Sequence, residues 1–164
     1  MRRTIFLLAV LIAIPTAVWA QTPVPAPAPA LKAPFAAMQA NLSRIPNPAE
    51  KERWQANTAL WQVRVNKGGP LEAADLAAMK APLDQMKANV AKITDAAEKE
   101  RWQANVDMWQ ILTAQPGKVA KEGRDKMRAL LETIKANIAK VRVASEKERW
   151  ESNRELWTVT LRVM

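Results

Sequence analysis

The chain has 164 residues, no cysteine and no histidine, and a formal net charge of +9. Without cysteine no disulfide can form, and without histidine the commonest metal ligand and general base is missing. The basic balance suits an acidic partner such as anionic lipid, polysaccharide or nucleic acid, but it is equally consistent with ordinary solubility.

The first twenty residues have the pattern of a secretory signal peptide. Arg2 and Arg3 form a basic start, an apolar run follows at residues 5–14, and Val18 and Ala20 offer small side chains at the −3 and −1 positions for cleavage. The run is too short for a stable membrane span. Residues 1–20 hold two basic and no acidic residues, so cleavage lowers the net charge from +9 to +7. We expect a periplasmic or secreted protein with no membrane span after cleavage.

A segment rich in proline and alanine follows at residues 21–30, with proline at every second position from Pro23 to Pro29. Such a composition favours extended polyproline II structure and predicts a semi-rigid linker. The folded domain is therefore expected to begin at residue 31.

The rest of the chain repeats three times with a period of 48 residues. The pentapeptide Glu-Lys-Glu-Arg-Trp occurs at residues 50–54, 98–102 and 146–150. In each copy an asparagine follows three residues after the tryptophan, and a second tryptophan follows four residues later. A fixed period of this size is typical of units that bury their apolar faces on one another. The expected repeats are residues 31–78, 79–126 and 127–164.

Each repeat predicts two antiparallel helices. The first carries apolar residues at a 4-3-4-3 spacing, as at Leu31, Phe35, Met38, Leu42 and Ile45. Pro82 is expected to kink one such helix or to start a new one, and the third is expected to run straight over about residues 119–141. The sequence therefore predicts an all-α fold of three tandem helical hairpins, forming a short solenoid or a six-helix bundle.

The second helix of each repeat has recognisable ends. Asn47 and Asp95 are expected to cap the first two, and Ser145 begins a capping box in the third. Glycine and proline at residues 68–70 and 116–117 predict where the first two stop.

The tryptophans of each second helix are seven residues apart and share one face. Two interpretations are open: a platform that stacks sugars, bases or an unfolded client, or the repeat core. Regular spacing beside a small aliphatic core favours the structural interpretation. The predicted structural core comprises Trp54, Trp61, Trp102, Trp109, Trp150 and Trp157.

Two sets of asparagines recur with the repeat: Asn41, Asn89 and Asn137, and then Asn57, Asn105 and Asn153. A partly buried asparagine needs hydrogen-bond partners, and pairing between helices or repeats would fix their register. A carboxamide can also bind a ligand, but one polar residue inside an apolar stripe favours the register role.

The acidic residues do not predict a catalytic pair. Glu50 and Glu52 point about 200° apart on a helix, and Glu50 is expected to pair with Arg53 three residues later. No feature marks a glycosidase built from carboxylates of different repeats. The methionines are expected in the core and not as copper ligands. We therefore predict no enzyme, no catalytic or metal residues and no cofactor.

Basic residues recur at equivalent positions of the first helices. Stacked hairpins would align them into ladders that follow a polyanion, with an affinity that falls as salt rises. The alternative is a solvated face interleaved with acids such as Asp84 and Glu132. The candidate polyanion-binding residues are Lys32, Arg44, Lys80, Lys87, Lys92, Arg128, Lys135 and Lys140.

The leading hypothesis is an exported, non-catalytic protein that binds another macromolecule in a chaperone-like or scaffold role. Residues 112–115, Leu-Thr-Ala-Gln, resemble the LTxxQ motif of small basic helical chaperones of the bacterial periplasm, and the resemblance implies client binding. The alternative is a binding module for an anionic polymer or cell-wall glycan. Whether the chain forms oligomers, or the third repeat docks onto another chain, stays open at this point.

Overall fold

The computed structural model describes residues 29–164, and these residues form six α-helices and no named strand. The helices are α1 (Pro29–Ala40), α2 (Pro48–Lys67), α3 (Ala73–Val90), α4 (Ala96–Leu112), α5 (Lys121–Ile138) and α6 (Ala144–Val163). A short 3-10 turn, Leu42–Arg44, follows α1. The predicted signal peptide and most of the predicted linker lie outside the described residues, and α1 begins two residues before the expected start of the domain.

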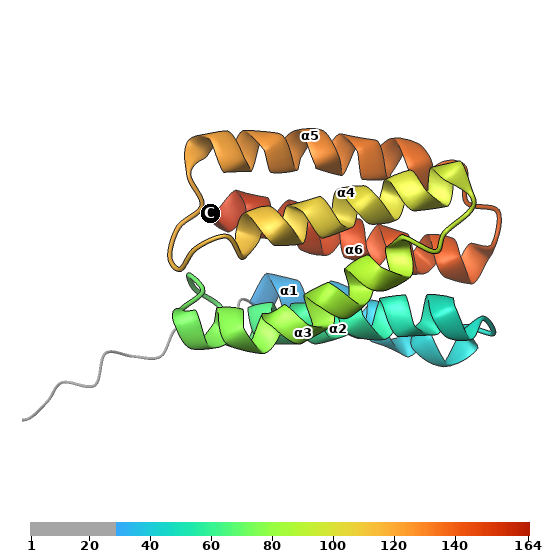
Figure 1. Cartoon of the computed structure of the whole chain (residues 1–164), viewed down its shortest axis with the longest axis horizontal. Coiled ribbons are helices and arrows are strands. Elements are labelled where there is room, and N and C mark those ends of the chain that lie inside the picture. The colour runs from blue at the N-terminus through green and yellow to red at the C-terminus, as the bar shows by residue number, and fades with distance from the viewer. Residues whose placement is uncertain (1–28) are drawn as a thin grey trace, which may run out of the picture.

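The six helices form a closed bundle whose helices run along the long axis of the molecule (Figure 1). Helices α2, α4 and α6 meet one another through their tryptophans, while α3, α5 and α1 pack mainly on α2, α4 and α6 respectively. The contact between α1 and α6 joins the first described helix to the last. The architecture is therefore the six-helix bundle and not the open solenoid, and the third repeat docks onto the first.

The N-caps of the inner helices α2, α4 and α6 agree with the sequence prediction in two of the three repeats. The Asn47 side chain accepts the backbone N–H groups of Ala49 and Glu50, and Asp95 accepts that of Glu98. The capping box expected at Ser145 is wrong, because α6 already begins at Ala144 and its first turn has no side-chain cap.

The outer helices α1, α3 and α5 occur in the predicted order along the chain, but some of them begin or end at other residues than predicted. Helix α3 is continuous from Ala73 to Val90, so Pro82 lies inside it and does not start a new helix. Helix α5 is shorter than expected, since it runs from Lys121 to Ile138. Across residues 29–164, the helices are too short or too polar to cross a membrane.

The core is built in layers around the bundle axis. Trp54, Trp102 and Trp150 form one triangle, with ring centroids 4.8–4.9 Å apart. The remaining three tryptophans, Trp61, Trp109 and Trp157, form a second triangle with separations of 4.5–4.6 Å. All six are at most 1% exposed. The structural interpretation of the tryptophans is thus confirmed, because tilted and edge-on aromatic contacts fill the interior and leave no exposed indole platform.

Candidate functional site

The asparagines Asn57, Asn105 and Asn153 form a closed ring between the two tryptophan layers. Each side chain donates its Nδ2 to the Oδ1 of another member at 3.0 Å, in the order Asn57 to Asn153, Asn153 to Asn105 and Asn105 to Asn57. Each Oδ1 also accepts an indole Nε1 at 2.8–2.9 Å. All three side chains are fully buried. The predicted pairing between repeats is confirmed, and these amides are not open to a ligand.

Two of the three predicted asparagines of the outer helices also join repeats through their side chains, whereas among residues 29–164 the Asn41 side chain bonds only to Ala37 and Arg44 of its own repeat. Asn89 donates to Glu52 at 3.2 Å, and Asn137 donates to Glu100 at 3.1 Å. In both pairs the asparagine belongs to the repeat that follows the glutamate. These bonds therefore fix how each outer helix sits on the preceding inner helix.

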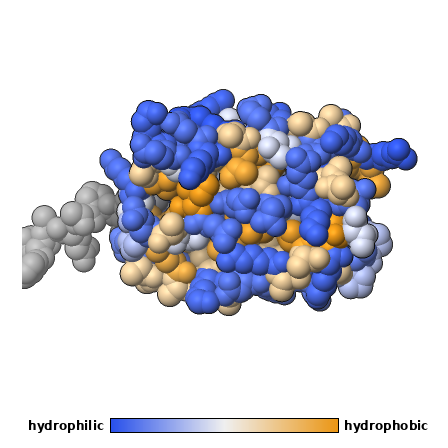
Figure 2. All heavy atoms as spheres, turned by 45° about the horizontal axis from the view of Figure 1, so that its top comes forward, coloured by the Kyte–Doolittle hydropathy of each residue, from blue (hydrophilic) through white to orange (hydrophobic). Residues whose placement is uncertain are grey.

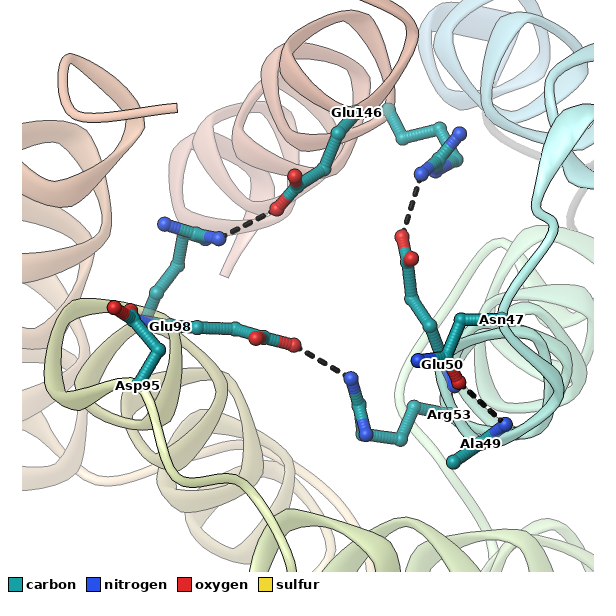
Figure 3. A network of polar contacts seen from close by, with 9 residues as sticks. Asn47, Ala49, Glu50, Arg53, Asp95, Glu98 and Glu146 are labelled. Carbon is teal, nitrogen blue, oxygen red and sulfur yellow. Dashed lines mark hydrogen bonds and ion pairs between the residues drawn. The ribbon is translucent and has the colours of Figure 1, made fainter. Parts of the chain in front are cut away.

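A second ring, here called the Arg–Glu ring, lies at the N-terminal ends of α2, α4 and α6 (Figure 3). Its three ion pairs are Arg53–Glu98 at 2.5 Å, Arg101–Glu146 at 2.6 Å and Arg149–Glu50 at 2.6 Å. Each pair joins two repeats. The predicted pair between Glu50 and Arg53 on one helix is therefore wrong, because closure of the bundle brings a glutamate of the neighbouring helix to each arginine.

The arginines of this ring are buried between the carboxylates and the first tryptophan layer. They are 2–6% exposed, and their guanidinium groups lie 4.9–5.7 Å from the centroids of indole rings on neighbouring helices. Such contacts stabilise a desolvated cation. Burial lowers the pKa of Arg101, and burial also raises the pKa of Glu146, against the opposing effect of Arg101. The Arg–Glu ring therefore has no net charge, and its three ion pairs hold the three repeats together.

Three carboxylates thus converge from three repeats, which the sequence interpretation did not foresee. All three, however, bond to arginines. Within residues 29–164, no group of acidic side chains is arranged to hold a metal ion.

The ring end of the bundle, defined as residues 41–53, 89–101 and 137–149, has a positive excess. It holds ten basic and seven acidic residues, of which three of each form the Arg–Glu ring. The other four acids face seven basic residues that form no ion pair within residues 29–164. These seven are Arg44, Lys51, Lys92, Lys99, Lys140, Arg142 and Lys147.

The structure separates the eight predicted basic residues into two groups. Four lie within α3 and α5 and pair with acids on their own helix: Lys80 and Lys87 with Asp84, Arg128 with Asp125, and Lys135 with Glu132. The other four, Lys32, Arg44, Lys92 and Lys140, form no ion pair within the described part of the chain. Bundle closure places equivalent residues around the axis and not in a ladder along one side.

Sequence reasoning missed one set of basic residues. Lys51, Lys99 and Lys147 lie in the first turns of α2, α4 and α6, and all three are exposed. They belong to the same recurring pentapeptide as the Arg–Glu ring. Their fixed place in that pentapeptide was the available signal, but roles were predicted for its glutamates, its arginine and its tryptophan and none for its lysine.

The opposite end of the bundle contains a cavity of about 150 Å³, here called the end cavity. The last turns of α2, α4 and α6 and the connectors α2–α3 and α4–α5 line it. The Gly117 N–H donates to the Leu71 carbonyl at 2.8 Å and ties the two connectors together. Arg64, which is 4% exposed, and Lys118 are its cationic lining residues. No part of this cavity was predicted from the sequence.

Comparison of the chain with protein-family models, curated proteins and solved structures finds no match. Function is therefore argued from the described residues alone. The two candidate surfaces are the unpaired basic residues of the ring end and the end cavity around Arg64.

Proposed function

We propose that this protein is a non-catalytic, exported binding protein that docks an anionic polymer on its ring end. The observation that supports the proposal is the set of seven unpaired basic side chains there, against four acids outside the Arg–Glu ring. The N-termini of α2, α4 and α6 lie at the same end and add partial positive charge. A polyanion gains from both contributions.

The character of the surface favours this function over the chaperone-like one. Among residues 29–164, the large hydrophobic side chains that stand exposed are Val143 and Val163. On the face shown in Figure 2, hydrophilic residues cover most of the surface and hydrophobic ones appear in small patches between them. Binding of unfolded clients through apolar contacts calls for a larger exposed patch.

The four predicted basic residues within α3 and α5 support polyanion binding less well. Each of them already has an acid on its own helix, as Lys80 has Asp84 at 2.8 Å. An incoming anion would have to compete with that carboxylate. Within residues 29–164 the side chains of Arg44, Lys92 and Lys140 donate only to the neutral asparagine three residues before them. These three are therefore the first positions to neutralise.

The test is a titration of the chain with inorganic polyphosphate at about 50 mM and about 200 mM salt. We expect the affinity to fall steeply with salt, because binding releases condensed counterions. The triple variant R44Q/K92Q/K140Q is expected to bind at least about tenfold more weakly than the wild type at the lower salt.

The matched control is K80Q/R128Q/K135Q, which removes the same number of positive charges from the outer helices α3 and α5. We expect it to lose less than about threefold in affinity, since those charges are already compensated. Equal losses in the two triple variants would mean that only net charge matters and would contradict a ring-end site. Salt-independent suppression of client aggregation by the wild type would support the chaperone-like role instead.

A further inference from the structure

The end cavity has the size and lining of a small-molecule site. Its volume of about 150 Å³ matches a cavity that accepts a benzene molecule in another protein. Leu71, Leu112 and Val119 provide aliphatic walls, the charged side chains of the lining are those of Arg64 and Lys118, and Met164 also lines the cavity. The space therefore suits an apolar body of about six carbon atoms with one polar end.

Arg64 is a buried cation without an ion-pair partner among residues 29–164. Its guanidinium has five N–H donors, yet within residues 29–164 it makes one hydrogen bond, from Nη1 to the Gly69 carbonyl at 3.1 Å. No acid within these residues forms an ion pair with it. Burial lowers the pKa of Arg64, and no acidic side chain opposes that effect. Every arginine of the Arg–Glu ring, by contrast, has its own glutamate.

The position of Arg64 in the repeat shows that packing does not require a cation there. The equivalent residues are Leu112 in the second repeat and Thr160 in the third, whereas the Arg–Glu ring, the asparagine ring and both tryptophan triangles are built from the same residue types in all three. The Thr160 Oγ1 is also buried without a hydrogen-bond partner. This layer thus holds a cation without an ion-pair partner and a hydroxyl without a hydrogen-bond partner within residues 29–164.

We propose that the end cavity binds a small monocarboxylate with an apolar body of the size of benzoate or hexanoate. The carboxylate accepts hydrogen bonds from the free N–H groups of Arg64, whose planar fork suits that geometry. The hydrocarbon part packs on Leu71, Leu112 and Val119, and Lys118 adds positive charge. This site lies at the end of the bundle opposite the proposed polyanion surface and does not depend on it.

The test compares sodium benzoate with benzyl alcohol, which has a similar shape and no charge. Both are titrated into the chain, and binding is followed by calorimetry or by ligand-observed NMR. We expect benzoate to bind at least about tenfold more tightly than benzyl alcohol, because the charge-assisted bonds to Arg64 need the carboxylate.

Two variants of the chain test whether Arg64 causes the tighter binding of benzoate. In R64L, which carries the residue that the second repeat has, the benzoate affinity should fall by at least about tenfold. R162L removes an exposed arginine from the same end of the bundle, outside the cavity lining, and should change the affinity by less than about twofold.

Three results would overturn the proposal: no benzoate binding up to about 10 mM, equal affinities for the two ligands, or equal losses in R64L and R162L. If R64L does not fold, R64K takes its place, since lysine keeps the charge and loses the fork. R64K is then expected to weaken benzoate binding and to leave benzyl alcohol binding unchanged. An unchanged benzoate affinity in R64K would also overturn the assignment.

Discussion

The two ends of the bundle are built from the same three helices and differ in how their buried arginines are paired with acids. At the ring end the three repeats supply identical arginines and glutamates, and each ion pair joins two repeats. At the cavity end the repeats supply Arg64, Leu112 and Thr160, and within residues 29–164 Arg64 has no ion-pair partner and the Thr160 hydroxyl has no hydrogen-bond partner. Where the copies agree, closure of the bundle pairs each buried arginine with a glutamate of a neighbouring repeat. Where they differ, charge and space are left for a ligand.

The largest effect is expected in the symmetric interior, from the variant N105A. Asn105 accepts hydrogen bonds from the Nδ2 of Asn153 and the Nε1 of Trp157, and both donors are buried. Without their acceptor, each stranded donor costs about 1–3 kcal/mol, so the free energy of unfolding should fall by about 3–5 kcal/mol. Urea denaturation followed by tryptophan emission measures this loss.

The control for that variant is N66A, which changes an exposed asparagine near the end of α2. Its effect should stay within about 0.5 kcal/mol. A loss below about 1 kcal/mol in N105A would mean that the asparagine ring contributes little to holding the repeats together.

The two ends are compared directly by making the same substitution in both, R101L at the ring end and R64L at the cavity end. R101L leaves the half-buried Glu146 without its cation and removes a cation–π contact, so we expect a loss of about 2–4 kcal/mol. R64L breaks one hydrogen bond and removes an uncompensated buried charge, so its effect should stay within about 1 kcal/mol. Similar losses at the two positions would remove the energetic distinction between the ends.

The closure of the bundle is the part of the fold that the sequence could not decide. The 48-residue period and the apolar spacing predicted six helices, short turns and a tryptophan core, because both patterns are local. Whether three hairpins form an open stack or a ring depends on the rotation between neighbouring units, and no residue pattern states that angle. The decisive contact, Arg149 with Glu50, joins residues 99 positions apart.

The Arg–Glu ring and the end cavity differ in how clearly the sequence indicates them. Each glutamate of the Arg–Glu ring has an arginine three residues later, so a pair within one helix and a pair between helices look the same in sequence. At the cavity end there was a signal: the position equivalent to Arg64 carries leucine and then threonine. The repeat pattern identifies the residues that the three copies share, and Arg64 is not one of them.

A smaller effect is expected at the helix starts, where the repeats also differ. Asp95 caps α4 by accepting the Glu98 N–H at 2.7 Å, whereas α6 has no side-chain cap. D95A should therefore cost about 1 kcal/mol, and S145A should stay within about 0.5 kcal/mol. Paired urea denaturation curves test both. A larger loss in S145A than in D95A would contradict the caps described here.

The smallest effect concerns the pH dependence of the ring end. Burial raises the pKa of Glu146, Arg101 opposes that shift, and the neighbouring Glu50 and Glu98 raise the pKa further. A carboxyl group with a raised pKa in the folded state binds its proton more readily there than in the unfolded chain. The stability that depends on Glu146 should therefore increase as the pH falls from neutral towards the ordinary carboxyl range.

The variant E146Q isolates this contribution, because glutamine does not titrate. The unfolding free energy of the wild type minus that of E146Q should rise between about pH 7 and about pH 4. The matched control is D84N on the outer helix α3. Lys80 lowers the pKa of Asp84, so the corresponding difference should shrink as the carboxylate is protonated. Slopes of opposite sign are expected for the two variants. Slopes of the same sign would mean that the carboxylates of the Arg–Glu ring titrate like those on the outer surface, although burial separates the two environments.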